Sequence, residues 1–244
     1  MNVAIILAAG QSRRLKGVNK IFYHINKKPL IFYTLKIFER HPQIKKIIIV
    51  SRREDFKKFS SLIKDCKFKK IETIVRGGKE RQDSALNGLK ATETLGAKPG
   101  DLILFHNGCN PLVSSEDITK TIKAAKKYKA ALVGQPAKDT IKEVDKNKRI
   151  IKTIDRKRIF LAQTPQVIEY NLAKMAFEKA SREKFKGTDD VSLVEKLGIR
   201  PKIVQTSFKN IKATYHEDLE FVNSYIRKYP PRHLCFRYFV EKKH

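Results

Sequence analysis

Short runs of β-branched and other apolar residues recur along the chain, and longer amphipathic stretches separate them. Four of these runs, at 3–7, 47–50, 102–105 and 130–133, have the length of a strand and contain no polar residue. Such runs are typical of strands buried on both faces, and the stretches between them have helical spacing. The alternation therefore predicts an α/β fold with a mostly parallel sheet between helices.

One stretch, residues 138–159, departs from this alternation. It is polar and alternating, with a turn-like centre at 145–148. The pattern predicts a two-stranded β-hairpin, and an isolated hairpin is only marginally stable in water. We therefore interpret it as an arm that packs on a second subunit. The alternative is an edge hairpin folded back on the chain's own sheet.

The length of 244 residues suits one large α/β domain or two small ones, and no repeat or linker divides the chain. We expect a single domain over 1–229, which includes the arm at 138–159. A basic and aromatic tail follows at 230–244.

The net charge is +28, from 53 Lys and Arg against 25 Asp and Glu. Such a field attracts nucleotides, phosphorylated metabolites, nucleic acid and anionic membranes. The lysines are spread along the whole length without a clustered stripe, which favours a solvated surface over a nucleic-acid interface. No apolar run reaches membrane-spanning length, so we expect neither a membrane nor a nucleic-acid partner.

The three cysteines, Cys66, Cys109 and Cys235, lie far apart and form no C-x-x-C pair. This spacing argues against a disulfide framework and against a zinc site. The N-terminus lacks the basic and long apolar regions of a signal peptide. We therefore expect a protein of the reducing cytoplasm.

Three small residues and then two cations follow the first apolar run: Ala8, Ala9, Gly10, Arg14 and Lys20. Small residues let a ligand approach the backbone closely, and fixed cations beside such a loop can hold a polyphosphate. The dinucleotide fingerprint and the P-loop are both absent. A strand followed by a glycine turn and surface arginines, without any ligand, is the alternative.

A second loop carries paired glycines, Gly77 and Gly78, between the predicted strand 71–75 and a predicted helix. Paired glycines before a helix expose backbone N–H groups, which suits reading a base or binding an anion. Polar segments then follow along the chain at 105–107, 139–142, 155–156, 163–166, 188–190 and 210–212.

Taken in order from Ala8 to about Leu219, these segments resemble the 2-C-methyl-D-erythritol 4-phosphate cytidylyltransferases of the non-mevalonate isoprenoid pathway. Each motif alone is weak, but together they are specific. The resemblance implies a Rossmann-like fold with helices on both faces, a homodimer built with the hairpin arm, and Mg²⁺. It also implies that CTP and 2-C-methyl-D-erythritol 4-phosphate are joined, giving 4-diphosphocytidyl-2-C-methyl-D-erythritol and pyrophosphate.

The resemblance carries over residue by residue. Positions that match the catalytic groups are Arg14, Lys20, Arg156 and Lys212. Positions that match the CTP contacts are Ala8, Ala9, Gly10, Gly78, Arg81, Ser84 and Asn107. Positions that match contacts to the second substrate are Asn110, Thr140, Arg156, Thr164, Thr188 and Lys212. Structural roles stay open for two of them, because Thr188 has the setting of a helix N-cap and Ser84 that of an ordinary helix residue.

Two departures from the family pattern concern the metal. Where relatives usually show Asp-Ala-Ala-Arg-Pro, residues 107–111 read Asn-Gly-Cys-Asn-Pro. Asn107 therefore replaces a metal-binding carboxylate, and Asn110 replaces an arginine that faces the second substrate in the family. Lys209 stands where many relatives have an acidic residue. Mg²⁺ prefers carboxylate and phosphate oxygens, so we expect the CTP phosphates to supply most of its ligands. The protein's own metal ligands cannot be named from the sequence.

The implied chemistry suits these residue types. An oxygen of a phosphate monoester attacks the α-phosphorus of CTP in line, and pyrophosphate leaves. The nucleophile is already an anion, so cations matter more than a general base, and His106 is expected to be structural. Two alternatives stay open. Asn107 and Asn110 leave room for a ribitol-phosphate or other sugar-phosphate nucleotidyltransferase, and the net charge of +28 for a nucleic-acid-binding protein.

Overall fold

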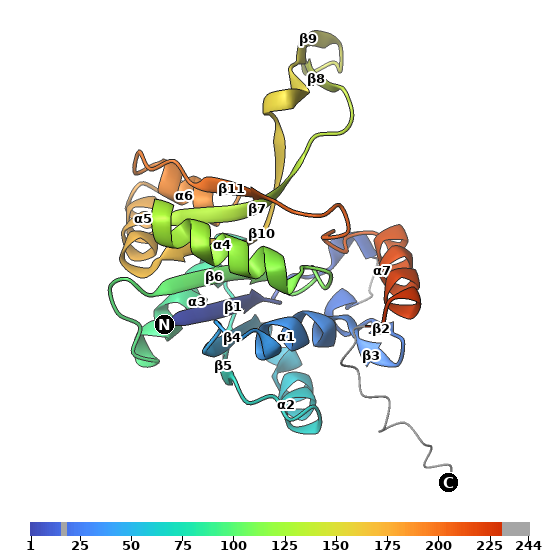
Figure 1. Cartoon of the computed structure of the whole chain (residues 1–244), viewed down its shortest axis with the longest axis vertical. Coiled ribbons are helices and arrows are strands. Elements are labelled where there is room, and N and C mark those ends of the chain that lie inside the picture. Colours follow the sequence, from blue (N-terminus) through green and yellow to red (C-terminus); the bar gives the residue numbers. More distant parts are fainter. Residues whose placement is uncertain (16–18, 231–244) are drawn as a thin grey trace.

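A computed structural model describes residues 1–15 and 19–230. The seven strands of the central sheet, in chain order, are β1 (Asn2–Leu7), β4 (Lys46–Ser51), β5 (Ile71–Arg76), β6 (Leu102–Asn107), β7 (Ala130–Pro136), β10 (Phe160–Glu169) and β11 (Lys202–Gln205). Across the sheet they lie in the order β11–β7–β10–β6–β1–β4–β5 (Figure 1). Neighbouring strands are parallel, except that β10 is antiparallel to both β6 and β7. The predicted mostly parallel sheet is confirmed.

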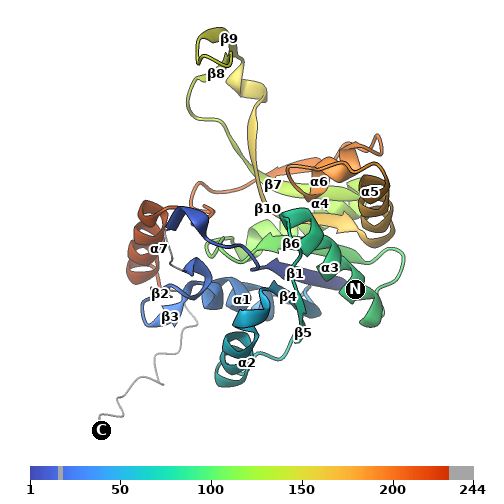
Figure 2. The ribbon, with the colours of Figure 1, turned by 180° about the vertical axis from the view of Figure 1, so that it is seen from behind.

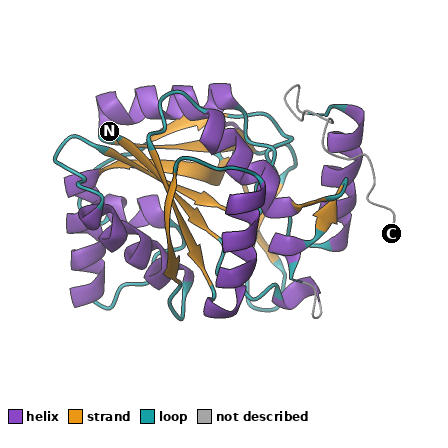
Figure 3. Cartoon of the chain, turned by 90° about the horizontal axis from the view of Figure 1, so that it is seen from below, coloured by secondary structure: helices purple, strands orange, loops and turns teal. Residues whose placement is uncertain are grey.

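Helices cover both faces of this sheet (Figure 3). One apolar cluster contains buried residues of α1 (Leu30–Arg40), α2 (Phe56–Asp65), α4 (Ser115–Tyr128) and α7 (His216–Lys228). The other contains buried residues of α3 (Arg81–Thr94), α5 (Tyr170–Arg182) and α6 (Asp190–Glu195). The short elements are the 3₁₀ helices η1 (Arg13–Leu15), η2 (Lys20–Phe22), η3 (Arg53–Asp55) and η4 (Arg156–Arg158), and the strands β2 (His24–Ile25) and β3 (Lys28–Pro29).

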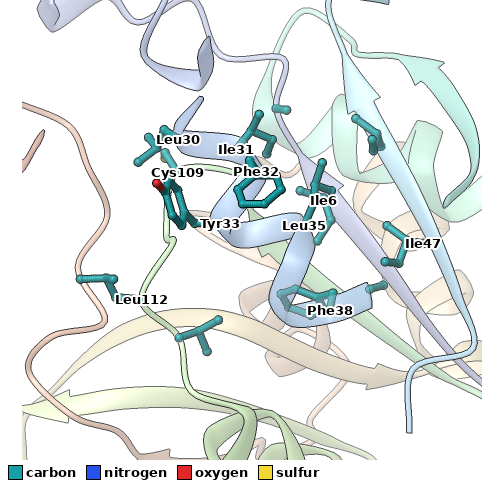
Figure 4. Close-up of a cluster of buried hydrophobic side chains, with 14 of the residues drawn as sticks. Ile6, Leu30, Ile31, Phe32, Tyr33, Leu35, Phe38, Ile47, Cys109 and Leu112 are labelled. Carbon is teal, nitrogen blue, oxygen red and sulfur yellow. The ribbon is translucent and has the colours of Figure 1, made fainter. Parts of the chain in front are cut away.

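Both faces of the strand β1 are buried. Successive side chains of a strand point to opposite sides of its sheet, so they enter different apolar clusters. Ile6 lies in one apolar cluster with Leu35 and Phe38 of α1 (Figure 4), and Ile5 lies in the other. On the α3 side, a Cβ at Gly88 would lie 2.5 Å from Cγ2 of Ile5. Gly88 thus lets α3 approach β1 closely, and this approach brings the first turn of α3 toward the loop that follows β1.

The segment 138–159 forms a hairpin of β8 (Ile141–Val144) and β9 (Ile150–Ile154). The two strands pair with each other and not with the central sheet, and the hairpin projects from the body of the molecule (Figures 1 and 2). The alternative of an edge hairpin folded back on the chain's own sheet is therefore wrong. Three apolar side chains of the hairpin, Val144, Ile150 and Ile151, are 46%, 63% and 59% exposed.

The predicted tail at 230–244 lies, from residue 231 on, outside the described residues. The domain boundary at 229 therefore stays a prediction. Of the helices in the described ranges, none combines the length and the apolar character that crossing a bilayer requires.

Candidate active site

A cavity of about 390 Å³ opens where β1 and β6 end. In open α/β sheets, ligands bind at the carboxyl ends of the strands, and this cavity lies at such an edge. Its walls come from the loop after β1, the loop before α3, the end of β6 and the segment 212–214. The predicted site residues that line it are Ala8, Ala9, Gly10, Arg14, Lys20, Gly78, Arg81, Ser84, Asn107 and Lys212.

The two small-residue loops pack tightly against each other on one side of this cavity. A Cβ at Gly77 would lie 2.3 Å from the Cβ of Ala9, and a Cβ at Gly78 would lie 2.2 Å from that of Asp83. Both distances are shorter than real Cβ contacts, so only glycine fits either position without a shift of the backbone. The backbone here is thus close enough to line a ligand site directly.

The hydroxyl of Ser84 holds the second loop in place. It accepts a hydrogen bond from the N–H of Gly78 at 3.1 Å and donates one to the C=O of Glu80 at 3.1 Å. Ser84 therefore lines the cavity while its hydroxyl serves the loop. The structural alternative for this residue has direct support, and a contact with the cytosine base stays a prediction.

Positive charge dominates the cavity. Five basic residues line it: Arg14, Lys20, Lys79, Arg81 and Lys212. Of the described residues that line it, Glu80 alone is acidic. Such a set of fixed cations attracts a polyphosphate and stabilises negative charge that develops during a reaction.

The two cations near the N-terminus are held by the segment before α7. The ammonium of Lys20 donates to the C=O of Ala213 at 3.1 Å. The guanidinium of Arg14 donates to the hydroxyl of Tyr215 at 3.4 Å, and its Cζ lies 5.3 Å from the centre of that ring. Residues about 200 positions apart in sequence thus build one wall of the cavity.

The profile of the family 2-C-methyl-D-erythritol 4-phosphate cytidylyltransferase (IspD) matches residues 2–228. The chain belongs to this family. Its members are nucleotidyltransferase enzymes, so the predicted enzyme class is confirmed.

Individual relatives agree with the family match. The 2-C-methyl-D-erythritol 4-phosphate cytidylyltransferase of Caldanaerobacter subterraneus subsp. tengcongensis is 42% identical over 231 residues, which cover 93% of this chain and all of that protein. That of Bacillus pumilus is 41% identical over 217 residues, with 88% and 92% covered. The crystal structure of the 4-diphosphocytidyl-2C-methyl-D-erythritol synthase from Anaerococcus prevotii has a TM-score of 0.81 at 31% identity, with 93% and 96% covered.

In the cavity at the ends of β1 and β6, the charge of Arg81 is neutralised by a carboxylate that sequence reasoning missed. Its Nη1 and Nη2 donate to Oδ1 and Oδ2 of Asp190 at 2.9 and 2.6 Å, and Asp190 is buried. Burial alone lowers the pKa of the Arg81 guanidinium, but the ion pair outweighs it, and the pKa is raised. Asp190 is the first residue of α6. The only sequence signal for this carboxylate was its position in the polar segment 188–190.

Lys212 is in a different electrostatic state from Arg81. No ion pair joins it to a carboxylate of the described residues. Partial burial of the ammonium lowers the pKa of Lys212, and repulsion from Lys20, Arg81 and Arg14 lowers it further. A cytidylyltransferase could use such a cation well, because its charge is not already satisfied by the protein.

The cavity does not fit a metal ion held by side chains alone. Asn107 offers an amide in place of a carboxylate, and its Nδ2 donates to Oδ1 of Asn110 at 3.3 Å. Glu80 caps α3 in a reciprocal pair with Asp83. Within the described residues, no three His, Cys, Asp or Glu side chains gather in a way that could hold a metal. Lys209 lines another cavity, beside Tyr225, and is not among the residues that line this one.

Two of the predicted second-substrate residues are buried behind Asn107 instead of lining the cavity. Thr164 is 3% exposed, and its hydroxyl accepts from the N–H of Asn107 at 3.2 Å. Asn110 is 1% exposed, and its C=O lies 3.1 Å from Nε2 of His106. Burial lowers the pKa of His106 to about 4, so its ring is neutral and structural, as expected.

The other three predicted second-substrate residues lie on exposed segments outside the cavity. Thr140 and Arg156 flank the hairpin, and the guanidinium of Arg156 donates to the C=O of Lys138. Thr188 is exposed as well. It is not the N-cap of α6, so that interpretation was wrong. Asp189 caps the helix instead, and its carboxylate accepts from the N–H of Ser192 at 3.0 Å.

Several residues of the cavity were absent from the predicted site. Lys79 and Cys109 line it, although both belong to segments that the sequence analysis had quoted. Thr214 lines it as well, and Tyr215 holds Arg14. Neither belongs to a recognisable motif, so only the fold reveals them.

Proposed function

We propose that this chain joins CTP and 2-C-methyl-D-erythritol 4-phosphate to give 4-diphosphocytidyl-2-C-methyl-D-erythritol and pyrophosphate, in the non-mevalonate isoprenoid pathway. The observation that carries the proposal is the cavity at the ends of β1 and β6, where basic residues surround a floor of small residues. Family membership over residues 2–228 supports the same reaction. It also favours an enzyme over a nucleic-acid-binding protein.

The reaction forms one P–O bond and breaks another. A phosphate oxygen of the acceptor attacks the α-phosphorus of CTP, and the bond from that phosphorus to the pyrophosphate oxygen breaks. The attacking oxygen is already anionic, so no proton has to be removed from it. The task of the protein is to bring the anions together and to neutralise the charge that develops.

Lys20, Arg14 and Lys212 fit this task. The first two are fixed by contacts with Ala213 and Tyr215, so their charges are in place before the substrate arrives. Preorganised charges of this kind need no reorganisation during the reaction, and removal of one such group typically costs about 100- to 1,000-fold in rate. Arg81 is already paired with Asp190 of α6, so we assign it a contact with CTP and not the stabilisation of developing charge.

Mg²⁺ enters this proposal with the nucleotide. The described residues offer no carboxylate cluster for it, whereas a triphosphate offers several anionic oxygens. We therefore infer that CTP and not the free protein supplies most of the metal ligands.

A homodimer through the hairpin is the second part of the proposal. The hairpin exposes three large apolar side chains, and Thr140 and Arg156 lie beside it outside the cavity. If the hairpin packs on a partner, both residues move toward the boundary between two subunits. The acceptor would then bind between the cavity of one subunit and the arm of the other, in a cytoplasmic enzyme.

Pyrophosphate release tests the reaction directly. The purified chain is supplied with CTP and Mg²⁺ and with a panel of polyol phosphates that includes 2-C-methyl-D-erythritol 4-phosphate and ribitol phosphate. We expect turnover with the first acceptor and a preference for CTP over UTP, ATP and GTP. Faster turnover with ribitol phosphate would move the assignment to the alternative acceptor class, and the absence of turnover with every acceptor would refute the proposal.

A further inference from the structure

A second cavity, of about 410 Å³, lies between α1, the segment 111–115 after β6, and α7. We call it the α1–α7 cavity. It shares no lining residue with the cavity at the ends of β1 and β6. Its volume falls within the usual range for small-molecule sites, which is about 300–1,000 Å³.

The walls of the α1–α7 cavity are mostly apolar. Phe32 and Tyr33 of α1 form one side, and Leu112 lies on the segment after β6 (Figure 4). Ile226 and Tyr225 of α7 close the other side. The hydroxyl of Tyr33 is already used, because it donates to the C=O of Ile25 at 2.6 Å. These walls suit the apolar body of a ligand.

Charge on the same cavity has one sign. Lys36, Arg40 and Lys209 line it, and none of the described residues that line it is acidic. The ammonium of Lys209 lies 5.7 Å from the ring centre of Tyr225, so this cation stands over the aromatic wall. Burial lowers the pKa of His41, and the nearby charge of Lys70 lowers it further, although the C=O of Ser115, 3.2 Å from Nε2, acts in the opposite direction. An apolar body next to a negative head group would complement this arrangement.

We propose that the α1–α7 cavity binds a small amphiphilic anion, an alkyl or prenyl phosphate, at a site separate from the CTP site. The apolar chain lies between α1 and α7, and the phosphate lies beside Lys209 and Arg40. Lys36 lines the cavity as well, but its ammonium lies 5.6 Å from the ring centre of Phe68, which is not a lining residue. The proposal concerns binding and stands whichever acceptor the enzyme uses.

Hydrogen bonds link the segments that flank the α1–α7 cavity to those that flank the catalytic cavity. Lys209 lies three residues before Lys212 in the chain. The N–H of Ala213 donates to the C=O of Cys109 at 2.8 Å, and the hydroxyl of Thr34 in α1 donates to the C=O of Gly108 at 2.9 Å. A ligand that shifts these segments would change CTP affinity, and CTP would change the affinity of that ligand by the same factor.

Calorimetric titration with octyl phosphate, below the concentration at which it forms micelles, tests the proposal. We expect saturable binding of one molecule per chain, and binding at least about tenfold weaker for octanol and for inorganic phosphate, because each lacks one half of the ligand. Geranyl phosphate is titrated in parallel to distinguish a branched prenyl body from a linear alkyl one.

Charge reversal locates the site. Lys209→Glu and Arg40→Glu should each weaken binding of octyl phosphate about tenfold or more, since each replaces an attraction by a repulsion. Lys57→Glu is the matched control, because Lys57 is exposed on α2 and lines neither cavity. Equal weakening in all three variants would show non-specific attraction to the basic protein and would overturn the proposal.

Two further outcomes would also overturn it. Competition by CTP that grows without limit would place octyl phosphate in the catalytic cavity, whereas coupling between separate sites reaches a finite plateau. The chain's own segment 231–244 is the other possible occupant, since Tyr229 lines the cavity and the segment follows closely. Binding of octyl phosphate that appears only in the full-length variant with Phe236→Ser and Phe239→Ser would show that the segment fills the cavity.

Discussion

The cavity at the ends of β1 and β6 and the hairpin arm hold different parts of the predicted site. In the cavity, the small-residue loops are packed together and the cations Arg14 and Lys20 are hydrogen-bonded within the same chain. Beside the arm, Thr140 and Arg156 are exposed, and nothing in the described chain covers them. The nucleotide half of the proposed site is therefore complete in one chain, and the acceptor half is open.

This difference separates two requirements of the reaction. Fixed charges and backbone groups lower the cost of charge development only when they are ordered before the substrate arrives. Groups on an exposed hairpin gain that order when a partner packs against them. We infer that CTP binding needs the single chain, whereas productive binding of the acceptor needs the dimer.

The largest expected effect lies in the nucleotide half. Lys20→Ala should lower kcat about 100- to 1,000-fold and change CTP binding much less, because the ammonium acts chiefly on the transition state. Steady-state pyrophosphate release and CTP titration measure the two effects. Lys57→Ala, an exposed lysine of α2, is the control. Near-native kcat in Lys20→Ala would remove this residue from the catalytic set.

The acceptor half should show a smaller effect that depends on assembly. Arg156→Ala should lower kcat/KM for the acceptor about 10- to 100-fold, the loss expected for one charge-assisted contact. Arg158→Ala, an exposed arginine of the same 3₁₀ helix, should change it little.

A mixture of the two impaired variants tests whether one site is built from both subunits. Equal amounts of Lys20→Ala and Arg156→Ala chains, allowed to exchange subunits, should recover roughly a quarter of the wild-type rate. Half of the randomly paired dimers are mixed, and each has one intact site if the site is shared between subunits. A mixture no faster than the Arg156→Ala protein alone would place both groups in the site of one chain.

The pH dependence of the rate tests the role of the Lys212 ammonium. The pKa of Lys212 lies below that of an ordinary lysine because of partial burial and neighbouring cations. Its ammonium should therefore lose its proton at a lower pH than an ordinary lysine would. The rate should then fall several-fold. Lys212→Arg keeps the charge and should extend the rate to higher pH. A kcat/KM profile across the alkaline range decides this, and identical alkaline limbs in both proteins would contradict it.

The smallest effect concerns the metal. Asn107→Asp should lower the Mg²⁺ concentration needed for half-maximal rate a few-fold, since a carboxylate is a better Mg²⁺ ligand than an amide. Asn171→Asp, exposed on α5, controls for the change in net charge. An unchanged requirement in Asn107→Asp would mean that this position does not face the metal.

The sequence was sufficient for the parts of the fold that rest on local pattern. The apolar runs identify β1, β4, β6 and β7 because strands buried on both faces need continuous apolar sequence. The reversed strand β10 was not predicted as a strand. Its sequence is broken by Gln163 and Thr164, and their segment had been interpreted as a substrate motif.

The same limit applies to the site. Loops that follow a strand directly come together at the cavity, since neighbouring parallel strands end at the same edge of the sheet. Asp190 and Tyr215 reach Arg81 and Arg14 through packing of distant helices, and no local pattern encodes such contacts. Thr140 and Thr188 were assigned to the site by the resemblance alone, and in the structure both are exposed outside the cavity.

The contact between Gly77 and Ala9 has a consequence for inhibitor resistance. A larger side chain at Gly77 would collide with the Cβ of Ala9, and one at Gly78 with the Cβ of Asp83, at 2.3 and 2.2 Å. A compound that binds the backbone of these two loops would therefore face few viable escape mutations. A compound that depends on the exposed side chain of Lys79, to which no role in the reaction is assigned, would leave more.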